Sequence, residues 1–208
     1  MGATNTKANT KVAQLTPEKL RLVQSYLTAI KAQTGQFEQS FGNSNSSSEK
    51  RHGQYWLDFP YRFRFAYAAN PKTKKQQIIT INKTWISIQD YAGAQANRFP
   101  SAITPLAVLQ NRAKAGFALA DIAPYVVAYE VRGQQTAFTL RDPSSKGGKH
   151  KIGGRLTLYF NSITRQLLGW QAVDLQNQKV QVRFFNVKYS DSLAPHLFFV
   201  QEDENVAR

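Results

Sequence analysis

The sequence predicts a mainly β fold with helices (α+β), in which one strongly curved antiparallel sheet carries helices against one face. Two observations predict it. From residue 35 onward, apolar and polar residues alternate over many short stretches that are separated by turn residues, as in consecutive antiparallel strands. Before this region, and again within it, the apolar period becomes that of an amphipathic helix. The 208 residues contain no evident linker or repeat and suffice for a substantial core.

The first helix is expected after a polar arm. Residues 1–15 have no apolar period and predict a disordered N-terminal arm, followed by a single domain over 16–208. Thr16 is a candidate N-cap and Pro17 the first residue of a helix of about four turns. Its apolar stripe is expected at Leu20, Val23, Leu27 and Ile30.

A second, shorter helix is expected over 104–116. Thr104 is its candidate cap and Gly116 its end, with Leu106 and Leu109 on its apolar side. The stretch "ALADIAPYVVAYEVRG" that follows fits either a helix or a strand.

The strands are expected in consecutive order. Residues 51–59 and 61–69 predict two strands separated by Pro60, which cannot donate to a ladder. "QIITIN" and "TWISIQD" predict a hairpin at Asn82, because asparagine tolerates a positive φ. Further strands are expected at "GQFEQSF", "QTAFTLRDP", "RLTLYFN", "LLGWQAVDL", "KVQVRFFNVKY" and "HLFFV", for about eight to eleven strands and two or three helices.

Charge indicates the class of partner. The net charge is +14, from 27 Lys and Arg against 13 Asp and Glu, which predicts nucleic acid, an anionic lipid surface or an acidic protein as a partner. Cysteine is absent, so disulfides and thiolate metal sites are excluded. No apolar run is long enough to span a membrane. The polar start fits either a cytosolic protein or Met1-Gly2 in place of a removed presequence.

Catalytic motifs are not found. The three histidines are far apart in sequence, the carboxylates are scattered, and no nucleophile elbow is present. The Gly- and Lys-rich stretch 144–155 lacks the spacing of a phosphate loop and predicts a mobile cationic hairpin loop. We therefore expect a binding protein and not an enzyme, with no cofactor and no metal.

The stretch "RHGQYWLDFPYRFRFAY", residues 51–67, separates rings from charge. Phe63, Phe65 and Tyr67 share one parity, whereas Arg62 and Arg64 share the other, so the rings and the guanidinium groups lie on opposite faces of a strand. Exposed rings could stack on nucleic acid bases, although the phosphate-binding charge would then lie on the wrong face. Rings that point inward would form either a plain core or the wall of a lipid cavity, and periodicity leaves both open.

The order of motifs resembles the LolA-type periplasmic carriers of outer-membrane lipoproteins. The similar pieces cover nearly the whole chain: a leading helix followed by "GQFEQS", then "GQYWLDFPYRFRFAY", "IITINKTWISIQD", "TPLAVLQNRA" and the closing "LLGWQAVDLQNQKVQVRFFNVKYSDSLAPHLFFV". The spacing Gly53, Trp56, Pro60 is moderately specific, and the ordered set is more so.

The resemblance implies an unclosed half-barrel under a helical lid, in a monomeric periplasmic protein. It implies that acylated lipoproteins are taken from an inner-membrane release complex, shielded, and delivered to an outer-membrane acceptor. A lipid sensor of the same fold is the alternative, and a nucleic-acid protein is less favoured. The family typically has arginine immediately before the motif's proline, where it helps to hold the lid closed. Here that position is Phe59, which implies a more open or more hydrophobic cavity.

The resemblance and the strand parity together place the expected site. Trp56 is then expected to face outward, and the positive charge is left outside, where it could steer the protein to anionic membrane surfaces. The cavity lining is expected to comprise Tyr55, Leu57, Phe59, Phe63, Phe65, Tyr67, Ile79, Ile81, Ile86 and Ile88. The inner stripe of the lid is expected to comprise Leu20, Val23, Leu27, Leu106 and Leu109.

Overall fold

The computed structural model describes most of the chain between residues 15 and 200. The described residues are 15–42, 49–70, 72–91, 95–101, 104, 106, 109, 117–141, 154–174 and 177–200. The N-terminal arm expected over 1–15 lies outside them except for its last residue. Most of the second expected helix and of the Gly- and Lys-rich loop also lies outside them.

All the strands described belong to one antiparallel sheet of eleven strands. Their order across the sheet is β6-β5-β4-β3-β2-β1-β11-β10-β9-β8-β7. The strands are β1 (Ala32–Phe41), β2 (Glu49–Asp58), β3 (Arg62–Tyr67), β4 (Ile78–Ile81), β5 (Trp85–Gln89), β6 (Asn97–Pro100), β7 (Val126–Arg132), β8 (Gln135–Leu140), β9 (Arg155–Asn161), β10 (Leu167–Val173) and β11 (Lys179–Ser190).

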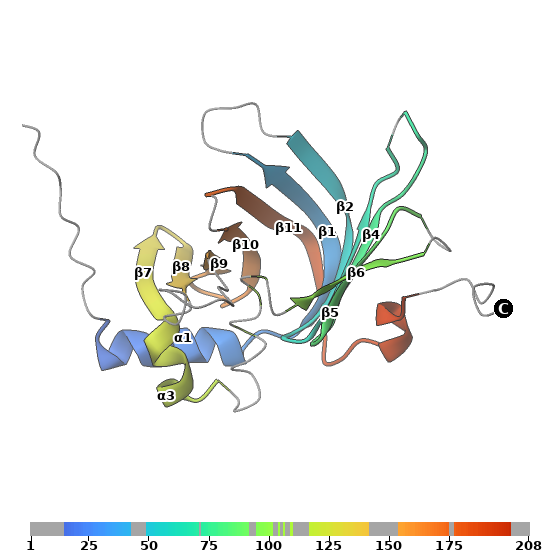
Figure 1. The fold of residues 1–208 in the computed structure, drawn as a ribbon. Helices are drawn as coiled ribbons and strands as arrows, with labels where there is room; N and C mark the ends of the chain where they lie inside the picture. Colours follow the sequence, from blue (N-terminus) through green and yellow to red (C-terminus); the bar gives the residue numbers. More distant parts are fainter. Residues whose placement is uncertain are drawn as a thin grey trace, which may run out of the picture.

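Pairing of β1 with β11 joins the N-terminal and C-terminal halves of the sheet. Within the described residues, β6 and β7 form its two edges and do not pair with each other, so the sheet is open. Figure 1 shows the strong curvature of this sheet. The fold class predicted from the sequence, an unclosed and curved antiparallel half-barrel, is therefore confirmed.

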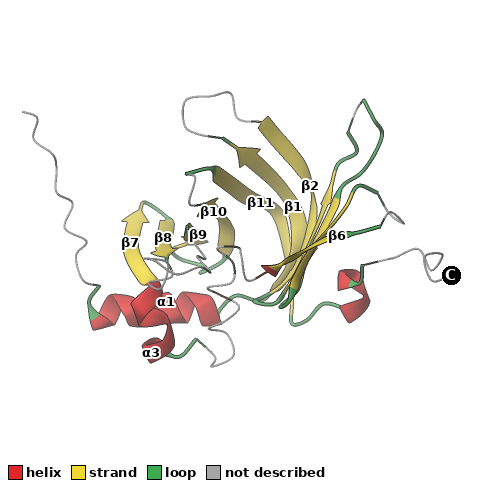
Figure 2. Ribbon diagram, in the orientation of Figure 1, coloured by secondary structure: helices red, strands yellow, loops and turns green. Residues whose placement is uncertain are grey.

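Helices lie beside the sheet and are short (Figure 2). They are α1 (Pro17–Thr28), α3 (Leu119–Ile122), η3 (Ala123–Tyr125) and η5 (Pro195–Phe198). Figure 1 shows α1 and α3 on one side of the sheet and η5 on the other. We call the sheet face whose side chains share a core with α1 the inner face, and the opposite face the outer face.

Helix α1 begins as expected and ends early. The Thr16 Oγ1 accepts a hydrogen bond from the backbone N–H of Lys19 at 3.4 Å, and Pro17 is the first helical residue. The helix ends at Thr28, with Ala29 as its C-cap, and β1 begins at Ala32. The helix predicted from the sequence was too long, because Ile30 continues the apolar period. In the structure, Ile30 lies in the connection between α1 and β1.

Two other local expectations were wrong in detail. "HLFFV" was expected to be a strand, but it lies mainly in η5, where Phe198 is buried against β3 and not paired in the sheet. The hairpin at Asn82 is present, but its φ is not positive. The Asn82 Oδ1 instead accepts hydrogen bonds from the backbone N–H groups of Thr84 and Trp85, at 2.9 and 2.7 Å, which is an Asx turn.

Candidate functional site

Four rings of the stretch 51–67, those of Tyr55, Phe63, Phe65 and Tyr67, lie on the inner face. Leu57 pairs with Phe63 and Tyr55 with Phe65 across β2 and β3, so these side chains stand side by side on one face. Tyr55 and Leu57 are fully buried, and Phe63 and Phe65 are at most 5% exposed. Tyr67 ends the row and is also buried. Their burial in a single core cluster with α1 is what the inward model of this stretch required.

The isoleucines of the next hairpin continue this face. Ile81 pairs with Phe63, and Ile79 pairs with Phe65. Ile86 and Ile88 follow on β5, opposite Ile81 and Ile79. Only Ile81 is buried, whereas the other three are partly exposed. The isoleucine side chains of the inner face are thus more exposed to solvent toward the edge strand β6.

Phe59 lies in the turn between β2 and β3, next to Pro60. Its side chain is partly buried, and its ring stacks on that of Phe117, with 5.6 Å between the ring centroids and 21° between the planes. Phe117 is 6% exposed and lies immediately ahead of α3. An apolar contact thus occupies the position at which the family resemblance implied an arginine.

The expected lid residues also lie in this core. Val23 and Leu27 of α1 are buried and Leu20 is partly buried against the same cluster. Leu106 and Leu109 are 9% and 3% exposed. Tyr26, on the same stripe, also anchors the helix through its hydroxyl group, which lies 3.2 Å from Thr136 Oγ1 on β8. The helix faces the sheet through one apolar stripe, as expected from its spacing.

The aromatic wall extends beyond the predicted residues. The Tyr55 ring stacks on Phe184 of β11 at 4.1 Å between centroids, and Trp170 of β10 stands edge-on to both Phe184 and Phe65. Phe37 of β1 is edge-on to Phe65 at 5.1 Å. The period-two alternation in "GQFEQSF", "LLGWQAV" and "KVQVRFF" was the available signal for these three strands. Strand β1 pairs directly with β2, its neighbour in sequence. The positions of β10 and β11 near this wall follow only from the long-range pairing of β1 with β11.

Two buried glutamines hold tyrosine hydroxyls within this wall. The Gln33 Nε2 donates to the Tyr55 hydroxyl oxygen at 3.2 Å, and the Tyr67 hydroxyl donates to Gln39 Oε1. Burial raises the pKa of Tyr55 above its usual value. Burial likewise raises the pKa of Tyr67 to about 12, against the opposing effects of Arg51 and the Gln39 hydrogen bond. Both tyrosines are therefore neutral and hydrogen-bonded at physiological pH.

The guanidinium groups of Arg62 and Arg64 lie on the outer face and contact the C-terminal segment. Arg62 forms an ion pair with Asp58, and its guanidinium carbon lies 5.0 Å from the centroid of the Phe198 ring. The Arg64 Nη1 donates to the backbone carbonyl oxygen of Phe199 at 3.2 Å. Partial burial lowers the pKa of Arg64. These two cations are thus engaged within the protein, which disfavours the nucleic-acid interpretation of this stretch.

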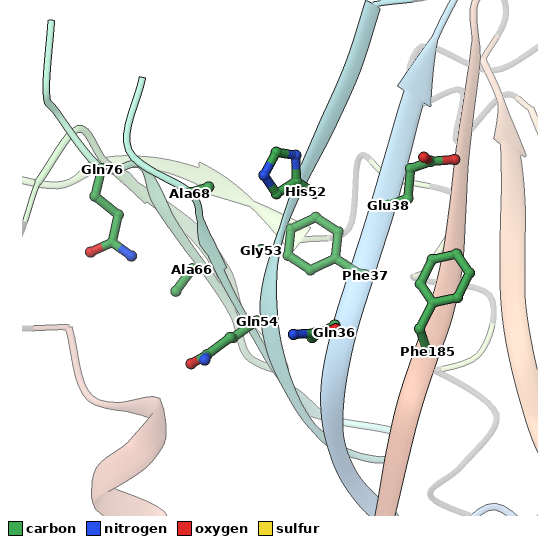
Figure 3. Close-up of a pocket in the computed structure, with 10 residues that line it drawn as sticks. All are labelled: Gln36, Phe37, Glu38, His52, Gly53, Gln54, Ala66, Ala68, Gln76 and Phe185. Atoms are coloured by element: carbon green, nitrogen blue, oxygen red, sulfur yellow. The ribbon is translucent and has the colours of Figure 1, made fainter. Parts of the chain in front are cut away.

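A hollow also lies on the outer face. Its volume is about 510 Å³ and its lining comes from β1, β2, β3, β11 and the β3–β4 connection (Figure 3). The inner-face rings instead pack against one another and against α1. In the part of the chain that the structure describes, no group of His, Cys, Asp and Glu has a metal-binding arrangement, and no helix could span a membrane.

Comparison with known families decides how this architecture is classified. The model of the family described as outer membrane lipoprotein carrier protein LolA matches residues 28–201. The chain belongs to the LolA family. The match covers every strand and leaves out most of α1. The family is one of carriers, and the curved sheet with α1 against its inner face is the fold that the resemblance implied.

Several solved structures are similar to this chain at low sequence identity, with TM-scores just below 0.5. A putative outer membrane lipoprotein-sorting protein domain from Vibrio parahaemolyticus is 11% identical over 87% of this chain and 96% of its own, with a TM-score of 0.48. A DUF1329 family protein from Desulfovibrio piger is 10% identical over 88% and 97%, with a TM-score of 0.49. A LolA superfamily protein from Nitrosomonas europaea is 8% identical over 86% and 97%, with a TM-score of 0.47. The comparison with curated proteins found no match.

Proposed function

We propose that this LolA-family protein carries acylated lipoproteins through the periplasm and delivers them to the outer membrane. In this proposal the acyl chains bind between the inner face of the sheet and α1, and the residues predicted from the sequence form the lining. The observation that carries this proposal is the continuous apolar wall, in which Trp170 of β10 stands edge-on to both Phe63 and Phe65 of β3.

The energetics of the cargo require a closed interior. Each methylene removed from water contributes about 0.8 kcal/mol, so a chain of about fifteen carbons contributes about 12 kcal/mol. Such a tail does not cross an aqueous compartment unshielded. A carrier must also release it, which requires a cover that opens at modest cost.

Helix α1 and the Phe59–Phe117 contact are the proposed cover. In the structure the protein's own rings occupy the space beneath α1. Loading therefore requires α1 to move away from the sheet, so that acyl chains replace ring-to-helix contacts. Since one apolar contact then replaces another, the net cost of opening is smaller than the burial of the rings alone would indicate.

The partners follow from the same proposal. An inner-membrane complex releases the cargo, and an outer-membrane acceptor receives it. The excess positive charge directs the carrier to anionic bilayer surfaces. The protein acts as a monomer, because one inner face suffices for one cargo.

A lipid sensor, or another lipid-binding envelope protein of this fold, is the second candidate. The filled interior favours it, because a sensor needs to open only when its lipid appears, whereas a carrier must open in every cycle. The two functions differ in what co-purifies: a carrier retains triacylated polypeptides, and a sensor retains free lipid.

The test is the identity of the bound molecule. The protein is purified without detergent from the native periplasm and extracted with organic solvent, and acyl species are identified by mass spectrometry. Acylated peptides support the carrier, and free lipids alone support the sensor. The absence of any acyl species, together with a gel shift on nucleic acid, would reject both.

A further inference from the structure

The hollow on the outer face combines three carboxamide side chains with one exposed ring. Gln36 of β1 pairs with Phe185 of β11 on one side and with Gln54 of β2 on the other. Residues paired directly across strands lie on the same face, about 4.8 Å apart from strand to strand. Phe185, Gln36, Gln54 and then Ala66 of β3 therefore form one row across four strands. The row is about 14 Å long, from three such spacings.

A second row lies beside the first. Glu38 of β1 pairs with His52 of β2. The backbone N–H of Ala68 donates to the carbonyl oxygen of His52 at 2.8 Å, which places Ala68 next in this row. Figure 3 shows the side chains of both rows, with Phe185 on one side of the hollow and Gln76 on the other. We call this hollow the outer-face groove.

Small residues create the depth of the groove. Ala66 and Ala68 lie where β3 would otherwise present longer side chains, between Gln54 and Gln76. The resulting volume of about 510 Å³ is within the range of small-molecule sites. A shallower hollow of about 340 Å³ adjoins it, shares Gln36 and Gln54, and is bordered by Trp56. The two hollows together extend the groove along β1 and β2.

The polar groups of the groove are accessible. Gln36, His52, Gln54 and Gln76 are all exposed. The Gln36 Oε1 accepts a hydrogen bond from Asn186 Nδ2 at 2.8 Å, which orients the amide and leaves its Nε2 group turned away from Asn186. A carboxamide offers two donors and an acceptor, and a hydroxyl group offers one donor and two lone pairs. Neighbouring carboxamides can therefore both donate hydrogen bonds to neighbouring hydroxyl groups and accept hydrogen bonds from them.

The ring supplies the complementary apolar contact. The Phe185 side chain is 41% exposed and lies at the end of the row. The guanidinium carbon of Arg183 lies 5.8 Å from its ring centroid, toward the next hollow along β11. A ring beside a row of carboxamides suits a ligand with both C–H faces and hydroxyl groups.

Two other ligand classes fit the groove less well. The residues that line the larger hollow include no Lys or Arg but do include Glu38, which forms an ion pair with Lys50 at 3.4 Å between Oε1 and Nζ. Lys188 lines only the smaller, adjoining hollow. Phosphates of nucleic acid or lipid require cationic partners that the larger hollow lacks. An extended peptide binds by pairing with a free strand edge, whereas β11, β1, β2 and β3 are all interior strands of the sheet.

We propose that the outer-face groove binds a short neutral oligosaccharide. Its hydroxyl groups are bound by Gln36, Gln54 and Gln76, and one sugar face packs on the Phe185 ring. The length of the row accommodates about two or three sugar residues, at strand spacings of about 4.8 Å. This site lies on the opposite face from the proposed acyl site, and the inference does not depend on carrier function.

The test uses two defined trisaccharides, chitotriose and maltotriose. Each is titrated into the isotopically labelled protein, and binding is measured by saturation-transfer and amide chemical-shift changes. We expect millimolar or tighter binding of at least one trisaccharide, with shifts at Gln36, Gln54 and Phe185. Gln54→Ala and Phe185→Ala are each expected to weaken binding at least about tenfold, which corresponds to about 1.4 kcal/mol.

Gln178→Ala is the matched control, because Gln178 is an exposed glutamine beyond the groove, at the turn before β11. It should bind as the wild type does. The three variants change exposed side chains and should leave the urea midpoint and acyl-probe binding unchanged. The proposal is overturned if neither trisaccharide binds, or if the two groove variants bind as tightly as the control.

Discussion

Phe59 connects the β2–β3 turn to the segment ahead of α3 through one ring contact. Its stack on Phe117 lies at the rim of the core, where the partly buried ring has apolar neighbours and some access to solvent. An aromatic pair of this kind contributes about 0.5–1.5 kcal/mol beyond area burial. A contact of this size holds a cover in place and still allows it to open.

Phe59→Arg should weaken binding of a fluorescent acyl probe by about tenfold, corresponding to the loss of about 1.4 kcal/mol. The substitution removes the stacked contact and places a charge beside the apolar interior. Fluorescence titration measures the affinity. Phe199→Arg is the control, since Phe199 is 65% exposed on the outer side. Unchanged or tighter binding in Phe59→Arg would remove Phe59 from the acyl site.

Ionisation of the Tyr67 hydroxyl group should lower the free energy of unfolding at alkaline pH. Burial raises its pKa to about 12 from a reference value of 10.0, so the unfolded chain loses this proton at lower pH than the folded protein does. The contribution is complete below pH 10 and is lost as the pH rises toward 12. Urea unfolding across this interval should show a shallower loss for Tyr67→Phe than for the wild type.

Tyr91→Phe is the comparison for this measurement, because Tyr91 is 48% exposed. Tyr67→Phe also leaves the buried Gln39 Oε1 without its donor, which costs about 1–3 kcal/mol at every pH. That offset does not alter the slope. Equal slopes for Tyr67→Phe and the wild type would mean that Tyr67 ionises alike in both states.

Helix α1 is attached to the sheet by packing and by one polar anchor. Tyr26 packs on Phe160 with 5.0 Å between ring centroids, and its hydroxyl hydrogen-bonds Thr136 Oγ1 and the carbonyl oxygen of Ser162, at 3.2 and 3.3 Å. The apolar contacts fix where the helix lies, whereas the hydroxyl fixes its orientation on β8 and the β9–β10 hairpin. The polar anchor can be removed without removing the ring.

Tyr26→Phe should therefore loosen α1 and speed uptake of the acyl probe. The lost hydrogen bonds correspond to about 1 kcal/mol, so amide exchange in α1 should accelerate while the rest of the sheet keeps its protection. Stopped-flow fluorescence measures uptake, and hydrogen exchange measures the helix. Leu22→Ala, on the exposed side of the same helix, should leave both rates close to wild type. Unaltered uptake in Tyr26→Phe would show that α1 does not control entry.

The sequence predicted correctly those elements that are determined by residues close together in the chain. Alternation in "YRFRFAY" placed the rings of β3 on one face and the guanidinium groups on the other, because parity is decided within the strand. The choice of the ring face as the inner one came from the family resemblance. The cap at Thr16 and the turn at Pro60 were equally local. The mechanism at Asn82 was missed, since an Asx turn and a positive φ favour the same residue and differ only in the hydrogen bonds formed.

The rest of the fold and site depends on distant partners. Phe184 and Trp170 join the wall only because β11 pairs with β1, and no local period specifies that neighbour. "HLFFV" has the composition of a strand, but Phe198 contacts Arg62 on the outer face and the segment is not paired in the sheet. Long-range contacts of this kind decide whether an apolar segment becomes a strand or a short helix.

The excess positive charge of the molecule includes both cations engaged within the protein and exposed lysines. Arg62 and Arg64 contact the C-terminal segment, so they contribute less to steering than their number implies. Lys72, Lys74 and Lys75 are exposed together in the connection between β3 and β4. With a net charge of +14, the protein should be attracted to anionic bilayers through such exposed lysines.

Binding to phosphatidylglycerol vesicles should accordingly fall as salt rises, because screening shortens the Debye length from about 10 Å at about 0.1 M to about 3 Å at about 1 M. Co-sedimentation measures the bound fraction, and phosphatidylcholine vesicles give the uncharged reference. Lys72→Glu combined with Lys74→Glu should weaken binding and flatten its dependence on salt. Binding that stays constant from low to high salt would mean that contact with the bilayer is not electrostatic, and the charge of this protein would then need another explanation.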